Sequence, residues 1–504
     1  PLYKRELEEG RLTRQKAAEL FGLLVVKFSE REPARGTLAL LQAESTVGQR
    51  ITLGGVTSGG KDATNELTYL LLEVIRQVKT VEPPVFVRCH VGTPAELWMK
   101  AMEVVRDRGD GCPAFVNDRA VLLNFAHKGI PLEATQDYAL SGCVHPRVPY
   151  YSAGGAIDCN LGVAKILEVT LNNGIDPRTG EKLGLTTGDP RDFSSFDELY
   201  QAYKRQFDFF ADYVGRYTRL LWPVHNMYYS APWFSTFLGD CLEKGLDYLR
   251  GGCRYPQLYQ IFADQGYQNT ADSLAAIKKL VFEDKKIMMD ELLQALEANF
   301  EGERNTEIRQ MLLAAPKYGN DDDYVDDIFS DLSLYGQRRL GQEKTFLGVN
   351  ARVTRPGLTG HVFLGKTTGA LPDGRKAWEP LADAALSPMV GVDVKGPTAV
   401  LKSASKANHT EVCTSTVFNI KFSPQVMQTR EGRQKVIDLV KTYFDRGGYF
   451  LQFNVMGTEV LRKAKLHREQ YRDLMIRVAG YSAYFVDLSP ALQDEIIART
   501  EHTL

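Results

Sequence analysis

Residues 476–500 read IRVAGYSAYFVDLSPALQDEIIART, and they carry the most specific pattern in the chain. Gly480 stands inside an apolar run flanked by aromatic residues, where a strand would place a side chain. A glycine in such a position generally marks a bulge or the close approach of another backbone segment. We therefore expect one of these two features at Gly480, although neither accounts for the pattern of residues around it.

A second unusual stretch, YALSGCVHPRVPYY (138–151), surrounds Cys143. Most cysteines in a chain of this kind pack as small buried hydrophobic residues. Gly142 and Pro146 instead indicate an exposed loop tip, where functional residues are common. His145 could then tune the Cys143 thiol or act as an acid or base. From composition alone, the structural and the reactive interpretation of Cys143 both stay open.

The rest of the chain predicts an α/β architecture. Amphipathic helical segments alternate with short apolar runs that are typical of buried strands, at 84–90, 448–456 and 415–422. This alternation favours a largely parallel sheet or barrel. Because no linker rich in Pro or Ser divides the chain, we expect one barrel domain over residues 1–453 and a distinct C-terminal segment over residues 454–504.

Composition excludes several functional classes. The 504 residues carry a formal net charge of −2, which gives no indication of a nucleic acid or an anionic membrane as partner. The sequence contains no run of eighteen apolar residues that would predict a transmembrane span. Seven scattered cysteines form no CxxC pair and no metal-ligand spacing, which favours a reducing cytoplasm over a disulfide scaffold.

Two further motifs have ordinary structural explanations. Residues Gly55–Lys61 match G-x-x-x-x-G-K, but Asp62 replaces the Ser or Thr that a phosphate loop needs, so we interpret the motif as a glycine turn before a helix. The acidic cluster Asp321–Asp323, with Asp326 and Asp327 close behind, does not follow the alternate spacing of a calcium loop. We expect it to be a solvated acidic turn that caps a helix.

The two unusual stretches together resemble a known family. RVAGYSAYF (477–485) is similar to the glycyl radical signature R-V-x-G-Y-x-A-x-F, and SGCVHP (141–146) resembles the cysteine-loop signature of the same enzymes, usually G-C-V-E-P. The chain is thereby identified as a member of the glycyl radical enzyme family, in its pyruvate formate-lyase-like and diol-dehydratase-like branch. Other stretches similar to that branch are ITLGG to DATNEL (51–67), 269–284, 315–326, 372–384, 396–403 and 453–464.

The resemblance implies a fold, a site and a partner. The family fold is a ten-stranded α/β barrel. The chain begins PLYKRELEEG with no initiator Met, and we expect the first part of the barrel to lie outside it. The resemblance assigns radical storage to Gly480 and the substrate-attacking thiyl to Cys143, 337 residues away. It implies a radical S-adenosylmethionine activating enzyme that installs the glycyl radical, with no bound cofactor or metal. We also expect a small-molecule substrate, a homodimer and a cytoplasmic location.

The chemistry agrees with these residue types. Only glycine leaves the α-carbon free of a side chain, so that a radical there can become planar and delocalise over the backbone. The S–H bond of cysteine is weak enough to give its hydrogen to that radical, and the resulting thiyl can take hydrogen from a substrate C–H bond.

The sequence departs from the family pattern at His145, where lyases and dehydratases of the family place Glu. Pyruvate formate-lyase itself has two adjacent cysteines, but here Gly142 precedes Cys143, so we do not expect acetyl transfer. We expect elimination from a small substrate by cleavage of C–O, C–N or C–S, with His145 as the base. Aryl-acetate decarboxylation and addition to fumarate are alternatives, and an inactive, truncated remnant is an alternative of another class.

Overall fold

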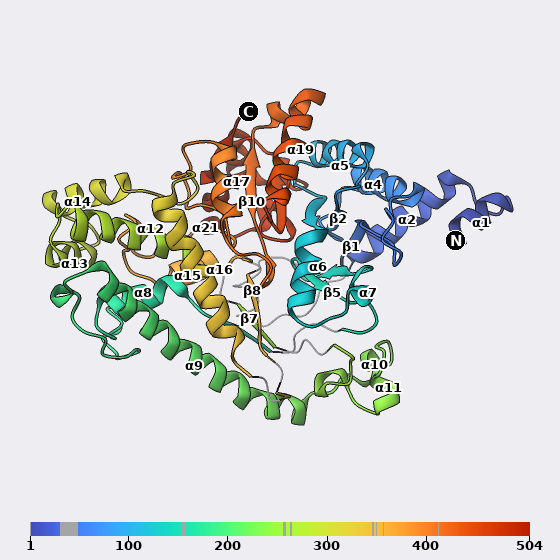
Figure 1. Ribbon diagram of the computed structural model, residues 1–504. Coiled ribbons are helices and arrows are strands. Elements are labelled where there is room, and N and C mark those ends of the chain that lie inside the picture. The colour runs from blue at the N-terminus through green and yellow to red at the C-terminus, as the bar shows by residue number, and fades with distance from the viewer. Residues whose placement is uncertain are drawn as a thin grey trace.

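The computed structural model describes residues 2–30, 49–152, 157–255, 259–262, 265–344, 347–348, 350–355, 357–411 and 413–504. Figure 1 shows helices surrounding strands from both halves of the chain. The α-helices are α1 (Leu2–Glu8), α2 (Arg14–Ser29), α4 (Glu66–Val78), α5 (Ala95–Arg108), α6 (Asp118–His127), α7 (Leu132–Thr135), α8 (Val163–Leu171), α9 (Phe196–Tyr228), α10 (Pro232–Ser235), α11 (Cys241–Lys244), α12 (Tyr267–Ile277), α13 (Met289–Glu297), α14 (Glu303–Ala314), α15 (Asp323–Gly341), α16 (Gly360–Gly365), α17 (Pro397–Ser405), α18 (Pro424–Gln428), α19 (Arg430–Asp445), α20 (Thr458–Leu466) and α21 (Pro490–Ala498).

The larger sheet has six strands in the order β1-β2-β3-β11-β10-β14. Neighbouring strands are parallel except β3 and β11, which are antiparallel. The strands predicted at 84–90 and 448–456 are confirmed as β2 and β11, both buried along their whole length. The six strands are β1 (Ile51–Gly54), β2 (Val85–Cys89), β3 (Ala114–Asn117), β10 (Asn419–Phe422), β11 (Phe450–Asn454) and β14 (Glu501–His502).

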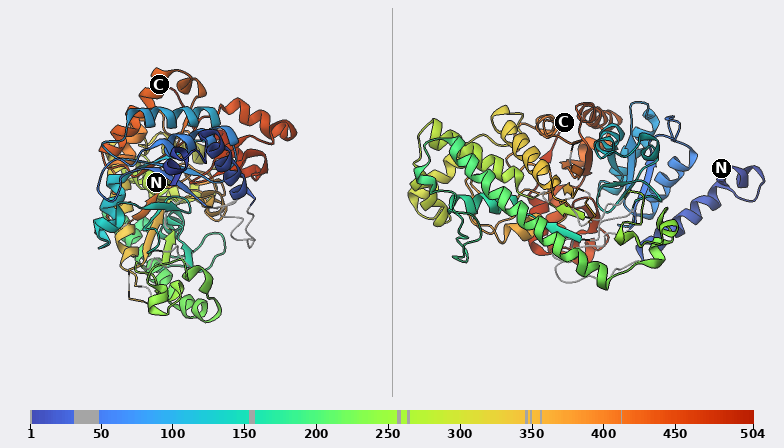
Figure 2. Two further views of the ribbon diagram at one scale, coloured as in Figure 1. Left: turned by 90° about the vertical axis from the view of Figure 1, so that its right-hand side faces the viewer. Right: turned by 60° about the horizontal axis from the view of Figure 1, so that its bottom comes forward.

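The smaller sheet has four strands, all parallel, in chain order. They are β6 (Ile157–Asn160), β7 (Tyr259–Phe262), β8 (Arg352–Arg355) and β9 (Cys413–Thr416). Two hairpins complete the strands of the described residues, β4–β5 (Ala139–Ser141 and His145–Arg147) and β12–β13 (Met475–Arg477 and Ser482–Tyr484). The views in Figure 2 agree that the long helix α9 runs past the smaller sheet toward α10 and α11.

The prediction of a single strand over 415–422 is wrong, because the chain changes sheets within it. Val417 N–H donates to Arg355 O of β8 at 3.0 Å, whereas Phe418 O accepts from Gln452 N of β11 at 3.1 Å. Adjacent residues thus bond to different sheets, and the segment divides into β9 and β10. At this crossing Val417 packs in the same buried cluster as Cys143 and Ala479.

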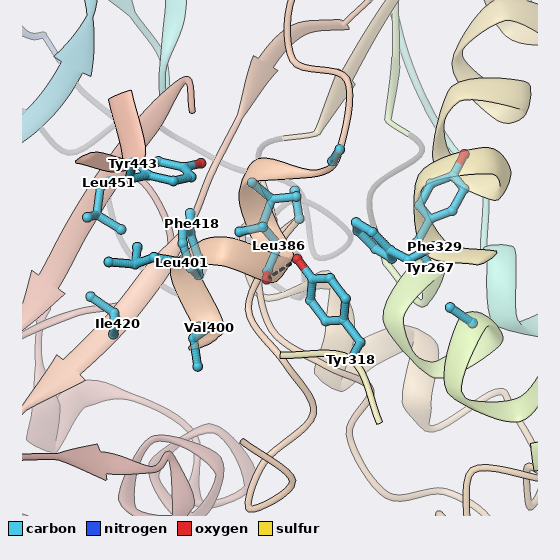
Figure 3. Packing of buried hydrophobic residues seen from close by; sticks show 14 of the residues in the cluster. Tyr267, Tyr318, Phe329, Leu386, Val400, Leu401, Phe418, Ile420, Tyr443 and Leu451 are labelled. Atoms are coloured by element: carbon cyan, nitrogen blue, oxygen red, sulfur yellow. Dashed lines mark hydrogen bonds between the residues drawn. The ribbon is translucent and has the colours of Figure 1, made fainter. Parts of the chain in front are cut away.

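Buried side chains from helices and both sheets form the main hydrophobic core (Figure 3). The Tyr318 hydroxyl donates to Leu386 O at 3.1 Å within this core, and its ring stacks at a tilt on Phe329, with centroids 4.2 Å apart. A buried tyrosine of this kind satisfies its polar end while contributing a large apolar surface. None of the helices in the described ranges is long and apolar enough to cross a membrane.

Asn269 and Thr270 are residues of types that often cap the N-terminus of a helix. They do not do so here, because helix α12 begins earlier, at Tyr267 after Gly266. Asn269 instead uses its side chain in a tertiary contact, since Nδ2 donates to Asp373 Oδ2 at 2.7 Å and Oδ1 accepts from Ala382 N at 2.8 Å. Stretches 269–284 and 372–384, which carry part of the family resemblance, therefore hold each other in the core.

Candidate active site

Cys143 lies at the tip of the β4–β5 hairpin. Residues 142–144 form its turn, where Gly142 has a φ of 55°. The hairpin packs against β1 of the larger sheet through β4 and against β9 of the smaller sheet through β5. The prediction of a loop tip is confirmed, but the expectation of an exposed one is wrong, because Cys143 is only 3% exposed.

Polar groups from β1 and β2 hold the base of this hairpin. Arg88 of β2 pairs with both carboxylate oxygens of Asp118 at 2.9 Å and donates to Tyr138 O at 3.1 Å. The guanidinium also lies over the Tyr138 ring, 3.8 Å from its centroid. Leu140 N–H donates to Thr52 Oγ1 of β1 at 3.0 Å. The sheet thereby determines where the cysteine tip points.

The turn itself is held by Arg50, whose Nε donates to Gly142 O. The Arg50 side chain is 1% exposed and pairs with Glu82, with 3.3 Å between Nη1 and Oε2. Burial lowers the pKa of Arg50, and the nearby Glu82 and Cys143 act in the opposite direction. A second buried guanidinium near Cys143 is that of Arg477, for which burial lowers the pKa to about 10.

Gly480 lies at the tip of the second hairpin, β12–β13. Its φ of 80° is in the left-handed region, and Val478 N–H closes the turn by donating to Tyr481 O at 3.0 Å. Gly480, Tyr481 and Phe485 are buried, and Tyr484 is half-buried. The close approach expected from the sequence is confirmed, and the neighbouring segment is the cysteine hairpin.

The tips of the two hairpins are in direct contact. A Cβ atom built on Gly480 would lie 2.4 Å from Cys143 Cβ and 2.9 Å from Cys143 Cα. In glycine that position is occupied by a hydrogen, so one α-hydrogen of Gly480 points at Cys143. The structure therefore brings into contact two residues that are 337 positions apart in the sequence.

Side chains of the larger sheet form hydrogen bonds with the glycine hairpin. Gln452 Oε1 of β11 accepts from Gly480 N–H at 3.2 Å and from Arg477 Nε at 2.7 Å. Asn454, also on β11, bonds to both backbone groups of Arg477, accepting from N at 2.8 Å and donating to O at 2.9 Å. Asn419 Nδ2 of β10 donates to Val478 O at 2.8 Å.

His145 is the first residue of β5 and is 6% exposed. Its Nε2 lies 2.7 Å from Thr354 Oγ1 of β8, and that hydroxyl lies 2.6 Å from Ser415 Oγ of β9. Its Nδ1 lies beside Gly142, 3.0 Å from the position of a Cβ there. Since residues 142–144 form a turn, the strand alternation that would align His145 with Cys143 does not apply across the tip.

The glycine motif at 55–61 and the acidic cluster at 321–323 have the structural roles expected from the sequence, with one exception. Gly55 belongs to a turn before helix α4, and a Cβ there would lie 2.4 Å from Arg88 Nε. Asp322 caps helix α15 by accepting from Tyr324 N. Asp326 corrects the expectation of a wholly solvated acidic turn, because it is fully buried against Lys406 Nζ at 2.7 Å and Ser403 Oγ at 2.8 Å.

Sequence reasoning missed the polar residues that support the two tips. Gln452, Thr354 and Ser415 lie in short buried strands and belong to no motif. The available sign of such a residue was Gln452, a polar side chain inside the apolar run 448–456, because a buried polar side chain requires a hydrogen-bond partner. The fold was needed to identify that partner.

Comparisons with known proteins show the family to which the chain belongs. Residues 1–365 match the family model described as "Pyruvate formate lyase-like", and residues 382–486 match the model described as "Glycine radical". The chain is 38% identical over 506 residues to trans-4-hydroxy-L-proline dehydratase of Clostridioides difficile, covering all of this chain and 63% of that protein. It is 37% identical to isethionate sulfite-lyase of Oleidesulfovibrio alaskensis, covering all of this chain and 61% of that protein.

A solved structure gives the same result. The crystal structure of hydroxyproline dehydratase from Clostridioides difficile, with trans-4-hydroxy-L-proline bound, matches with a TM-score of 0.95 at 37% identity, over all of this chain and 63% of that one. This likeness confirms the predicted type of α/β fold. The chain spans a little over three fifths of the length of the relatives it matches.

Proposed function

Because the chain belongs to the pyruvate formate lyase-like family of glycyl radical enzymes, we propose that it catalyses a radical elimination in which Gly480 stores the radical and Cys143 attacks the substrate. The observation that carries the proposal is the α-hydrogen of Gly480 that points at Cys143, since a Cβ in place of that hydrogen would lie 2.4 Å from Cys143 Cβ. Both relatives compared above carry names of elimination enzymes, a dehydratase and a sulfite-lyase.

The proposed relay conserves atoms and electrons at each step. Cys143 gives the hydrogen of its S–H bond to the Gly480 α-carbon, which becomes an ordinary glycine, and Cys143 becomes a thiyl. Cys143 then takes a hydrogen atom from a substrate carbon and is a thiol again. After the leaving group departs from the neighbouring carbon, Cys143 returns a hydrogen atom to the product and recovers one from Gly480.

His145 supplies the base in this proposal. Loss of a proton from a substrate hydroxyl helps to expel a leaving group from the adjacent carbon radical. Nε2 of His145 lies 2.7 Å from the Thr354 hydroxyl, and Nδ1 lies on the side of the cysteine turn, so the imidazole ring lies between β8 and that turn. The burial of His145 limits competition from water.

The partners in this proposal follow from the chemistry. A radical S-adenosylmethionine activating enzyme removes a hydrogen atom from Gly480, so no cofactor is bound during turnover. Both hairpin tips are buried, hence the activating enzyme must act on a conformation in which the glycine hairpin has left its place beside Cys143.

The test is anaerobic activation followed by a panel of small substrates. Trans-4-hydroxy-L-proline, isethionate, glycerol and propane-1,2-diol are the first choices, with an aryl acetate and fumarate as representatives of the alternatives. We expect elimination products, detected by mass spectrometry, from at least one compound with a leaving group next to a C–H bond. Turnover of only the aryl acetate, or of only fumarate with a second substrate, would contradict elimination.

A further inference from the structure

Gln452 is a buried residue whose side chain reaches the backbone of Gly480. It lies on β11, is 0% exposed, and accepts the Gly480 N–H at 3.2 Å through Oε1. We propose that Gln452 is a positioning residue for hydrogen transfer, because this bond holds the Gly480 α-hydrogen against Cys143. This inference rests on the proposed role of Gly480 as the radical residue.

The acceptor atom is itself fixed on several sides. The same Oε1 accepts from Arg477 Nε at 2.7 Å, and Gln452 Nε2 donates to Asn419 Oδ1. Asn419 Nδ2 in turn donates to Asp383 Oδ2 at 2.5 Å and to Val478 O at 2.8 Å. The amide of Gln452 therefore has one orientation, and its position cannot drift without breaking other buried bonds.

The geometry explains why this one bond matters for transfer. The direction of the α-hydrogens of a glycine depends on the orientation of its N–Cα bond, and the φ of Gly480 is 80°. An unrestrained glycine can reach many other values of φ. Because hydrogen transfer needs donor and acceptor in close contact, rotation away from this value would turn the α-hydrogen away from Cys143.

Loss of the glycyl doublet to a small added thiol measures the relay without any substrate. Cys143 gives the hydrogen atom of its S–H bond to the Gly480 radical and becomes the thiyl, which then takes a hydrogen atom from the added thiol. Gly480 is left as an ordinary glycine and the radical passes to the added thiol, so the doublet in electron paramagnetic resonance decays. Cys143→Ser, which lacks the relay, gives the rate of any direct reaction of Gly480 with the added thiol, and this rate is subtracted.

The experiment compares this rate, per spin, in activated wild type and Gln452→Met, which preserves volume and removes the acceptor. We expect the decay of the doublet to slow by about tenfold or more, the size of effect that a lost positioning contact produces. Gln452→Glu keeps an acceptor for Gly480 N–H and Arg477, and its doublet should decay at a rate close to that of wild type. Gln452→Asn withdraws the amide by one methylene and should be slow, which provides a second variant if Met prevents folding.

Gln493→Met is the matched control, since Gln493 is a buried glutamine of the same C-terminal segment that bonds to Phe485 O at 2.8 Å. Its doublet should decay at the wild-type rate. Equal rates in wild type and in a folded Gln452→Met or Gln452→Asn protein would overturn this inference and leave the proposed function standing. Absence of a glycyl doublet in activated wild type would instead contradict the proposed function itself.

Discussion

One α-hydrogen of Gly480 points at Cys143, because a Cβ in its place would lie 2.4 Å from Cys143 Cβ and 2.9 Å from Cys143 Cα. The contact is between backbone-level atoms of two buried turns, so neither residue can move away by a change of side-chain rotamer alone. Hydrogen transfer between them therefore depends on the position of the two hairpins.

The radical should reside on Gly480. Anaerobic activation should give a doublet from one α-hydrogen, and protein made with [2-²H]glycine should give a narrow line instead. Isotope labelling is the sharper test, because Gly480→Ala would also force the two hairpins apart. Air should then cut the chain at Gly480 and release a fragment close to residues 481–504, detected by mass spectrometry. An activated sample that stays intact in air would exclude this residue.

Cys143→Ser should keep the doublet but lose both turnover and the decay of the doublet with an added thiol, because the O–H bond of serine is too strong to pass its hydrogen to Gly480. Cys159→Ser and Cys413→Ser are the controls and should keep both activities. The side chain of Cys413 lies outside the part of the chain that the structure describes, and Cys159 is half-buried. Turnover by Cys143→Ser would show that another cysteine forms the thiyl.

His145→Gln should keep its radical and lower turnover by about 10²–10⁴, the usual contribution of a positioned base. His145→Glu should recover part of the rate. Its activity should also persist to lower pH than that of wild type, since a carboxylic acid ordinarily titrates near 4.3 and an imidazole near 6.5. His409→Gln, at a buried histidine that bonds to Ala404 O, is the control. An unchanged rate in His145→Gln would make His145 structural.

Thr354→Val should lower turnover less than His145→Gln, because it removes only the hydroxyl at 2.7 Å from Nε2 and leaves the imidazole in place. Freed from that hydroxyl, the imidazole can change tautomer, so the pH profile should change along with the rate. Thr354→Ser keeps the hydroxyl and should restore the profile of wild type. A Thr354→Val enzyme with the profile of wild type would remove Thr354 from this role.

Stability should depend on pH through Glu495 of helix α21. Burial raises the pKa of Glu495, but the charges of Arg499 and His361 outweigh it and hold the pKa at about 2, below the ordinary 4.5. The unfolded chain thus takes up a proton first, so this contribution is complete above pH 4.5 and is lost as pH falls toward 2. It is worth about 3 kcal/mol.

Denaturant unfolding of wild type and Glu495→Gln across this range is the measurement. The variant should be less stable above pH 4.5, and the gap should close toward pH 2. Glu8→Gln, at an exposed position of helix α1, should follow the wild-type curve. A gap between wild type and Glu495→Gln that does not change with pH would show that charge at Glu495 is not its source.

Local patterns in the sequence were sufficient for the class of fold, and the family resemblance of two short stretches identified Cys143 and Gly480 as the candidate site residues. The apolar runs at 84–90 and 448–456 are strands, because continuous apolar residues suit a sheet covered on both faces. The stretches around Cys143 and Gly480 are informative because each packs several constrained residues into a short segment. Such patterns depend on neighbours in the chain, and a sequence displays these directly.

Only the tertiary structure decided which distant groups meet. The contact of Gly480 with Cys143, the support of Gly480 N–H by Gln452 and the contact of His145 with Thr354 each join separate strands or hairpins. The change of sheet between Val417 and Phe418 brings those elements together, and it occurs within a run that has the pattern of one strand. The periodicity of a strand specifies which side chains share a face, whereas the partner of that face depends on how the whole chain packs.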